Sequence, residues 1–349
     1  MARLIDPWIA RSVARSLTGD GGISSSYLLD RLDRDLADAV PRSEALVAEV
    51  SGIPRPPPVR WRIIDRSEWA ETNISSMTRL VAPLAERVGS RLDAAPAPVR
   101  VAQRALVSVE VGALLGYVSR RVLGQYDLIV PEPGQDGAVL YFVGPNMVDT
   151  ERRFGFIPEE FALWVAVHEV THRFQFDGVP WLRKRFFSLV ERYFGTVDLD
   201  ARSLARRLRE AVARLASRSV PAEERNPVYL LASPEQRGVI DQIQTLMAVV
   251  EGHGNFVMDL VGRSEIPSFP RMRALFERRR AQTSRFQRAF NHAIGIEMKL
   301  RQYELGRTFC DAVVEKGGHE ALAHLWSSED EFPTLVELRE PSLWLRRVG

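Results

Sequence analysis

The amino-acid sequence predicts a mainly α-helical fold with a small antiparallel β element, which places the chain in the α+β class. Apolar residues recur at helical spacing over most of the 349 residues. Runs rich in β-branched and aromatic residues are short and few, and two of them flank a turn-forming segment. The composition, 45% hydrophobic and 26% charged, is that of an ordinary globular protein. We therefore expect a single helix-rich domain over residues 1–349.

The N-terminal part predicts two helices and a stiff connector. Residues 5–17 and 27–50 carry apolar side chains at helical spacing, with a glycine-rich loop between them. The sequence PRPPP at 54–58 stops any helix and favours an extended chain. We expect an N-terminal helical segment over 1–53 and a site-bearing core over 59–349.

The core is expected to begin with a strand and two helices. Residues 59–66 fit a strand, and 67–88 fit a helix with Ser67 as N-cap and acidic residues in the first turn. The long apolar segment 101–124 predicts a buried helix.

Two β-rich runs, at 126–132 and 138–144, bracket the turn PGQDG and predict a hairpin. The second run could be an edge strand on which an extended peptide aligns, or a plain sheet strand. The sequence leaves these two interpretations open.

The remainder of the chain predicts helices throughout. Their expected ranges are 158–177, 181–194, 198–218, 233–262 and 292–316. The arginine-dense stretch 271–290 could touch phosphates, but a solvated helix face with salt bridges is the more common structure for such a pattern.

Charge and cysteine content exclude several classes of protein. The net charge of +2 does not demand a nucleic acid or an anionic membrane as partner. The single cysteine cannot form an intrachain disulfide, which fits a reducing compartment. Arginines interrupt the apolar runs of the N-terminus, and no stretch of 18 uncharged apolar residues occurs. We expect a cytoplasmic protein without a transmembrane segment and without a nucleic-acid partner.

Two of the six histidines lie four residues apart in WVAVHEVTHRFQFDGVPWLR, which runs from Trp164 to Arg183. On a helix, His168 and His172 share one face and can present both imidazoles to one cation. Glu169 lies about 100° round the helix, where it can take a proton from a metal-bound water without ligating the metal. This is the arrangement of zinc metallopeptidases, so Zn²⁺ is the expected cofactor.

The apolar flanks of the motif strengthen this interpretation. Val165 to Val167 and Val170 predict a buried helix, and a buried helix rarely carries such polar residues without a role. The alternative is a core helix with hydrogen-bonded histidines. Arg173 is unusual, because a charge directly after the second histidine is atypical of zincins.

A catalytic zinc site needs a third protein ligand and an open fourth position. Glu251 in VVEGHGNFVMD lies among apolar residues, where a carboxylate is costly unless it is paired or bound to metal. His253 is the rival, because it would point about 200° away from Glu251 on the same helix. Asn255 and Asp259 follow on the face of Glu251 and could orient a ligand.

Hydrolysis of a peptide bond also needs a donor for the developing oxyanion. Tyr303 and Arg307 lie on one face of the last long predicted helix and are candidates for this role. The alternative for both is that they are ordinary half-buried helix residues.

Five motifs give the chain a family resemblance. They are IDRSEWAETN (64–73), HEVTHRFQFDGVPWLR (168–183), EGHGNFVMD (251–259), KLRQYELGRTFCDAVVEKGG (299–318) and LWSSEDEFPTLVEL (325–338). In order and wording they resemble a zincin-like metallohydrolase family of actinobacteria and Chloroflexi, one branch of which is associated with biosynthesis of a deazaflavin coenzyme. The resemblance implies a zincin-type site with His168 and His172 as ligands and Glu169 as base, and it supports Glu251 as third ligand.

These observations lead to two hypotheses of different kinds. The first is a zinc-dependent hydrolase that acts on a peptide or small amide, with the motif helix packed against a second helix that carries Glu251. The second is a non-catalytic scaffold or binding protein, in which a metal or a polar cluster only braces the fold.

Overall fold

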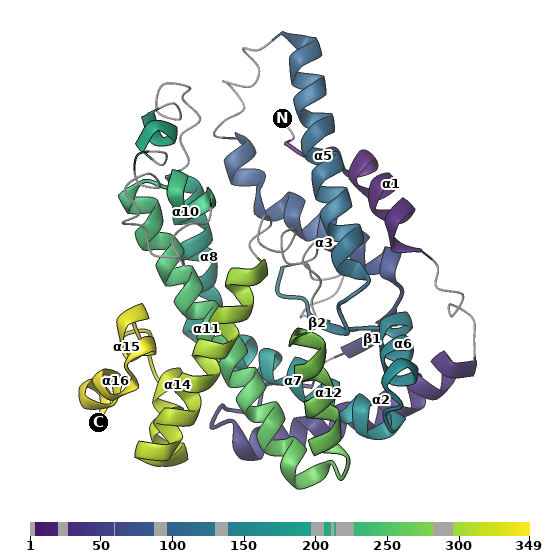
Figure 1. Ribbon diagram of the computed structural model, residues 1–349, viewed down its shortest axis with the longest axis vertical. Coiled ribbons are helices and arrows are strands. Elements are labelled where there is room, and N and C mark those ends of the chain that lie inside the picture. Colours follow the sequence, from purple (N-terminus) through teal and green to yellow (C-terminus); the bar gives the residue numbers. More distant parts are fainter. Residues whose placement is uncertain are drawn as a thin grey trace. The chain divides into compact units, whose positions relative to one another are not determined.

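The computed structural model is mainly helical and contains a small sheet (Figure 1). The prediction of a mainly α fold with a small β element is therefore confirmed. The structure describes residues 4–19, 27–58, 60–86, 96–129, 139–196, 206–210, 213, 227–281 and 296–349. Of the predicted helix over 198–218, the structure describes residues 206–210 and 213, which are helical, and the rest lies outside the described residues.

The chain divides into two compact units, each made of separate chain segments. Unit 1 comprises Met1–Glu49, Arg55–Arg173 and Val261–Ser268. Unit 2 comprises Val50–Pro54, Phe174–Leu260 and Phe269–Gly349. The boundaries fall inside two continuous helices, α7 (Pro158–Gly178) and α11 (Pro234–Glu265). A single domain over 1–349 stays a prediction.

The sheet of unit 1 has three strands in the order β1-β3-β2 within the described residues. They are β1 (Arg60–Ile64), β2 (Gly124–Tyr126) and β3 (Val139–Val143). The strands β2 and β3 form an antiparallel pair, as predicted, but β2 shares only Tyr126 with the predicted strand 126–132, and the turn PGQDG lies outside the described residues. Strand β1 runs parallel to β3 and makes the sheet mixed. Because β3 is paired on both sides, the idea that it is an edge strand for a peptide is wrong.

Three helices and one face of β3 share a hydrophobic core in unit 1. They are α1 (Pro7–Thr18), α3 (Arg66–Leu80) and α5 (Ala97–Ser119), and Figure 1 shows α1 lying along α5. Every residue of β3 is buried, and alternate β3 side chains belong to this core because strand side chains point to opposite faces in turn. The core residues are Ile5, Ala10, Ala14, Ile64, Trp69, Ala70, Ile74, Leu115, Val139, Tyr141 and Val143.

Helix α5 is less buried than its apolar sequence predicts. It buries one narrow face at Gly112 and Gly116, where a Cβ would come 2.4 Å and 2.9 Å from backbone oxygens of α1. Its other apolar side chains include Val101 and Leu106, which are 67% and 60% exposed. The prediction of a buried helix is wrong for this part, because apolarity alone does not reveal which faces find tertiary partners.

Among the described residues, α5 is the helix long and apolar enough to cross a membrane by length and composition. Core helices of soluble proteins pass the same test, so this property alone does not assign α5 to a membrane.

The cap of α3 differs from the predicted one. Asp65, rather than Ser67, is the N-cap, and its Oδ1 accepts a hydrogen bond of 2.8 Å from the amide of Glu68. The Ser67 hydroxyl instead lies 2.9 Å from that of Thr18 in α1. Aspartate and serine are both good caps, so local sequence could not separate two candidates only two residues apart.

A buried ion pair joins the motif helix to α2 (Tyr27–Val50) within unit 1. The Arg173 side chain is 1% exposed, and its Nη1 donates to Oε1 of Glu44 over 2.6 Å. The other Glu44 oxygen accepts from Arg55 at 3.0 Å. Glu44 therefore neutralises the charge that directly follows the second motif histidine.

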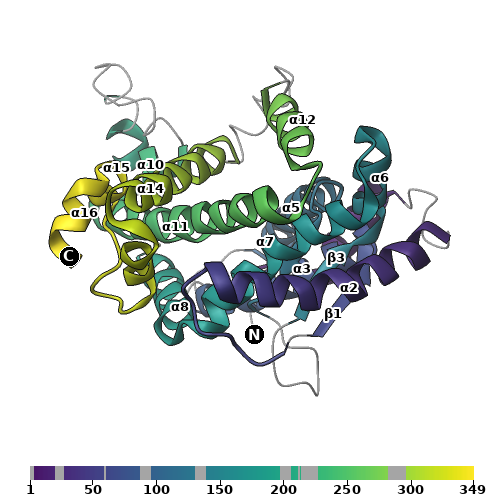
Figure 2. The ribbon, with the colours of Figure 1, turned by 90° about the horizontal axis from the view of Figure 1, so that it is seen from below.

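The regular secondary structure of unit 2 is helical in its described residues. Its helices, besides parts of α7 and α11, are α8 (Pro180–Gly195), α10 (Pro227–Leu231), α12 (Phe269–Ala281), α14 (Ile296–Ala323), η2 (His324–Trp326), α15 (Leu335–Arg339) and α16 (Pro341–Val348). Figure 2 shows α11 and α14 side by side. They touch at two glycines, because a Cβ on Gly252 would lie 2.2 Å from the carbonyl carbon of Gly306.

Replacing Glu44 with leucine is expected to lower the free energy of unfolding by about 3–5 kcal/mol, because Arg173 would stay buried without this carboxylate. Adding Arg173→Met should restore much of the loss, since the pair is then replaced by apolar side chains. Urea unfolding of the single and double variants measures both effects.

The matched control is Arg42→Ala, which breaks the exposed pair between Arg42 and Glu265. This change should cost less than about 1 kcal/mol. Equal losses for the buried and the exposed pair would contradict the importance assigned to burial.

Candidate metal centre

Helix α7 carries the histidine motif and is buried along most of its length. Pro158 suits its first position because an N–H there has no partner in the helix, and acidic residues follow in the first turn. The four apolar neighbours of the motif, from Val165 to Val167 and at Val170, are at most 4% exposed, as the sequence predicts. Polar side chains are thereby held in an apolar environment.

The two motif histidines face each other on α7. Their Nε2 atoms are 3.1 Å apart, and their ring centroids are 4.5 Å apart at an interplanar angle of 81°. Two nitrogens that bind one tetrahedral zinc at ordinary bond lengths lie about 3.3 Å apart. The spacing of His168 and His172 therefore suits a shared cation.

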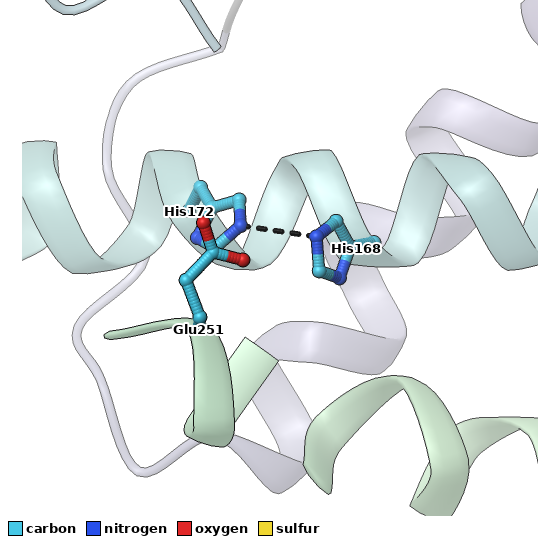
Figure 3. Close-up of side chains that lie close together, drawn as sticks. All are labelled: His168, His172 and Glu251. Atoms are coloured by element: carbon cyan, nitrogen blue, oxygen red, sulfur yellow. Dashed lines mark hydrogen bonds between the residues drawn. The ribbon is translucent and has the colours of Figure 1, made fainter. Parts of the chain in front are cut away.

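Glu251 of α11 completes a group of three possible metal ligands (Figure 3). One ligand atom from each of His168, His172 and Glu251 lies within 4.8 Å of the other two. Within the described part of the chain, this is the one group of three or more His, Cys, Asp or Glu side chains placed to hold a metal ion. Two imidazoles and a carboxylate are a donor set typical of catalytic zinc sites, so these residues fit the expected ion.

His253, the rival third ligand, has other partners. Its ring is fully buried, and its Nδ1 lies 3.0 Å from the side-chain nitrogen of Gln175. The ring also packs edge-on against Trp326, with centroids 4.8 Å apart. His253 is not part of the three-ligand group, so the geometry favours Glu251 over His253.

Glu169 is buried beside the edge strand of the sheet. Its side chain is 6% exposed and lies directly against the backbone of Gly124 in β2. A Cβ at position 124 would come 2.6 Å from Cγ and 2.8 Å from Oε1 of Glu169. A larger residue at position 124 would therefore require the Glu169 side chain to move, and the Gly124 backbone limits where the Glu169 carboxylate can lie.

The guanidinium of Arg307 is engaged in ion pairs, so it is not a ready oxyanion donor. Its Nη1 donates to Asp259, and its Nε donates to Asp311 over 2.9 Å. Burial alone would lower the pKa of this guanidinium, but the hydrogen bonds and charges of Asp259 and Asp311 together outweigh burial and raise the pKa. Tyr303 lies in α14, and its side chain falls outside the described residues, so its role stays a prediction.

The two polar residues that follow Glu251 do not act as the sequence suggests. Asn255 donates to the backbone carbonyl of Glu251 over 2.9 Å. Asp259 accepts from Arg273 as well as from Arg307. These hydrogen bonds stabilise α11 and its neighbours, and none of them is made to the side chain of a candidate ligand.

Two residues beside the candidate site were not predicted from the sequence, namely Gly124, which lies against Glu169, and Gln175, which follows His172 on α7. Gln175 follows His172 by three positions, so helical spacing places it on the face of both histidines. That spacing was a usable signal. Gly124 had none, since its importance comes from a contact with Glu169, which is 45 positions later in the chain.

Comparison with known proteins agrees with this geometry. The sequence pattern of the zincin-like metallopeptidase family matches residues 5–345. The crystal structure of a proposed hydrolase with a novel fold from Chloroflexus aurantiacus is similar, with 32% identity, 98% of each chain covered and a TM-score of 0.72. No curated protein matches. The family match indicates a metal-dependent hydrolase, and the chain belongs to the zincin-like metallopeptidase family.

Proposed function

We propose that the protein is a zinc-dependent hydrolase of gluzincin type that cleaves peptide or small amide bonds. In this proposal His168, His172 and Glu251 hold the zinc, and Glu169 is the general base. The observation that carries it is the approach of the three ligand atoms to within 4.8 Å of one another. Membership of the zincin-like family supports the same reaction class.

A bound zinc supplies Lewis acidity and lowers the pKa of water at its open position to about 7. The protein's own task is to move the proton. The Glu169 carboxylate lies about 100° round α7 from His168, so it is free of the ligand face. It would accept a proton from water and donate it to the leaving nitrogen.

Tyr303 is the proposed oxyanion donor, because a phenolic O–H can donate a hydrogen bond to developing negative charge. The alternative, Arg307, is paired with Asp259 and Asp311. We also infer that the protein acts in the cytoplasm on a peptide or amide rather than on nucleic acid. The near-neutral net charge of +2 and the single cysteine support these two points.

Metal content is the first test. Purified protein should contain about one zinc per chain, and His168→Ala combined with His172→Ala should remove it, because two of three protein ligands are lost. Inductively coupled plasma mass spectrometry measures the content. The control is His324→Ala, which removes a histidine that pairs with Glu331 and should leave zinc unchanged. A wild-type protein without zinc, or zinc retained by the double variant, would refute the site.

Glu169→Gln should separate catalysis from metal binding. The amide keeps the shape of the side chain but cannot act as a base, so turnover should fall by about 100-fold or more while zinc content stays constant. A library of internally quenched peptides and amides serves as the assay. Turnover that survives the change refutes Glu169 as base, and a wild-type protein that binds zinc but cleaves nothing favours the scaffold hypothesis.

Gly124→Ala should displace the general base without touching a ligand. The added methyl group overlaps Glu169, and a misplacement of about 1 Å can cost about 100-fold in rate. We expect slower cleavage in the same peptide assay and unchanged zinc content. Gly238→Ala is the matched control, because a Cβ there meets nothing within 4 Å. Equal rates for the two variants would contradict the proposed placement of Glu169.

A further inference from the structure

The side chain of Gln175 bonds to both flanks of Glu251. Gln175 is fully buried on α7, three residues after His172. Its Nε2 donates to the backbone oxygen of Val250 over 2.9 Å and lies 3.0 Å from Nδ1 of His253. These two acceptors stand one residue before and two residues after the candidate third ligand.

The chemistry of the contacts fixes the orientation of the Gln175 amide. A backbone carbonyl can only accept, so the amide NH₂ must face Val250. The same NH₂ then donates to Nδ1 of His253, which must accept and therefore carries its ring proton on Nε2. One amide group thus holds a backbone oxygen and a side chain of the same helical turn.

The same turn of α11 also packs directly against α14, which leaves α11 little room to move. A Cβ on Gly252 would lie 2.2 Å from the backbone of Gly306, and one on Gly306 would lie 1.7 Å from the oxygen of Ala248. The backbones of α11 and α14 are therefore in direct contact beside Glu251. With α11 supported by α14, the bonds from Gln175 determine how far this turn can rotate about its own axis.

We propose that Gln175 is a positioning residue that fixes the rotation of α11 at Val250 and His253 and thereby aims the Glu251 carboxylate at the cation site. This inference rests on the proposed function, because it requires Glu251 to be a metal ligand. It also gives His253 a role as an acceptor that anchors the ligand helix, in place of its earlier role as rival ligand.

The test is the zinc affinity of Gln175→Met, measured by competition with a chromophoric chelator. Methionine keeps the length and bulk of the side chain but cannot donate to Val250 or His253. Loss of a group that orients a metal ligand typically weakens metal binding by about 10- to 100-fold, and we expect a loss of this size. Unchanged affinity would overturn the proposal.

Gln236→Met is the matched control for general destabilisation. Gln236 is also a buried glutamine, but it lies on α11. Its amide bonds to the backbone of Ser233 and Thr196 instead of to the helical turn that carries Glu251. The control should lower thermal stability and leave zinc affinity unchanged. If it weakens zinc binding as much as Gln175→Met does, the effect is merely structural and the proposal fails.

A double-mutant cycle with Glu251→Ala shows whether Gln175 acts through Glu251. The weakening caused by Gln175→Met should shrink to below about 3-fold once Glu251 is absent, because the two changes then affect one shared interaction. The same weakening in both backgrounds would overturn the proposal. Failure of the proposed function looks different, since either the wild type would bind no zinc or Glu251→Ala would bind it as tightly as the wild type.

If Gln175→Met does not fold, His253→Phe takes its place in the cycle. Phenylalanine keeps a ring against Trp326 but removes the acceptor for Gln175. Zinc affinity that falls only when Glu251 is present supports the proposal, whereas unchanged affinity overturns it.

Discussion

Burial of the polar side chains of α7 is the constraint on which the site depends. Moving such groups out of water costs free energy unless each one finds a partner. Thr171 donates to the carbonyl of Val167 over 2.7 Å, and Arg173 donates to Glu44 over 2.6 Å. Gln175 meets its acceptors on α11. The Thr171 bond lies within α7, whereas the bonds of Arg173 and Gln175 tie two directions around α7 to residues of α2 and α11, so the helix cannot rotate without breaking both of these.

The angular order of these residues explains why a charge beside the second histidine is tolerated. At about 100° per residue, His168, His172 and Gln175 fall within an arc of about 60° on one face of α7. Arg173 points about 100° away from His172, toward Glu44, and Glu169 lies between those directions. The helix thus separates cation-binding, proton-accepting and structural residues by direction, although they are neighbours in the sequence.

Helical periodicity predicts most of this arrangement. The rest depends on tertiary contacts, which periodicity does not reveal. The motif helix was expected over 158–177 and extends from Pro158 to Gly178, since its period is a local property. The approach of Glu251 to the histidines agrees with the ligand that the apolar context suggested. By contrast, the exposed face of α5 and the approach of Gly124 to Glu169 depend on segments distant in sequence. One sequence carries no direct record of such contacts.

The arginines of helices that adjoin the candidate ligands are paired with carboxylates outside the three-ligand group. Two arginines of helices that adjoin the candidate ligands would repel a cation if their charge were not compensated. Glu44 pairs with Arg173 and Arg55, and Asp259 pairs with Arg307 and Arg273. Glu44 and Asp259 are both buried, so their charges act at short range with little screening by solvent. Asp311 and Glu277 pair with Arg307 and Arg273 as well, so four carboxylates outside the three-ligand group pair with these four arginines.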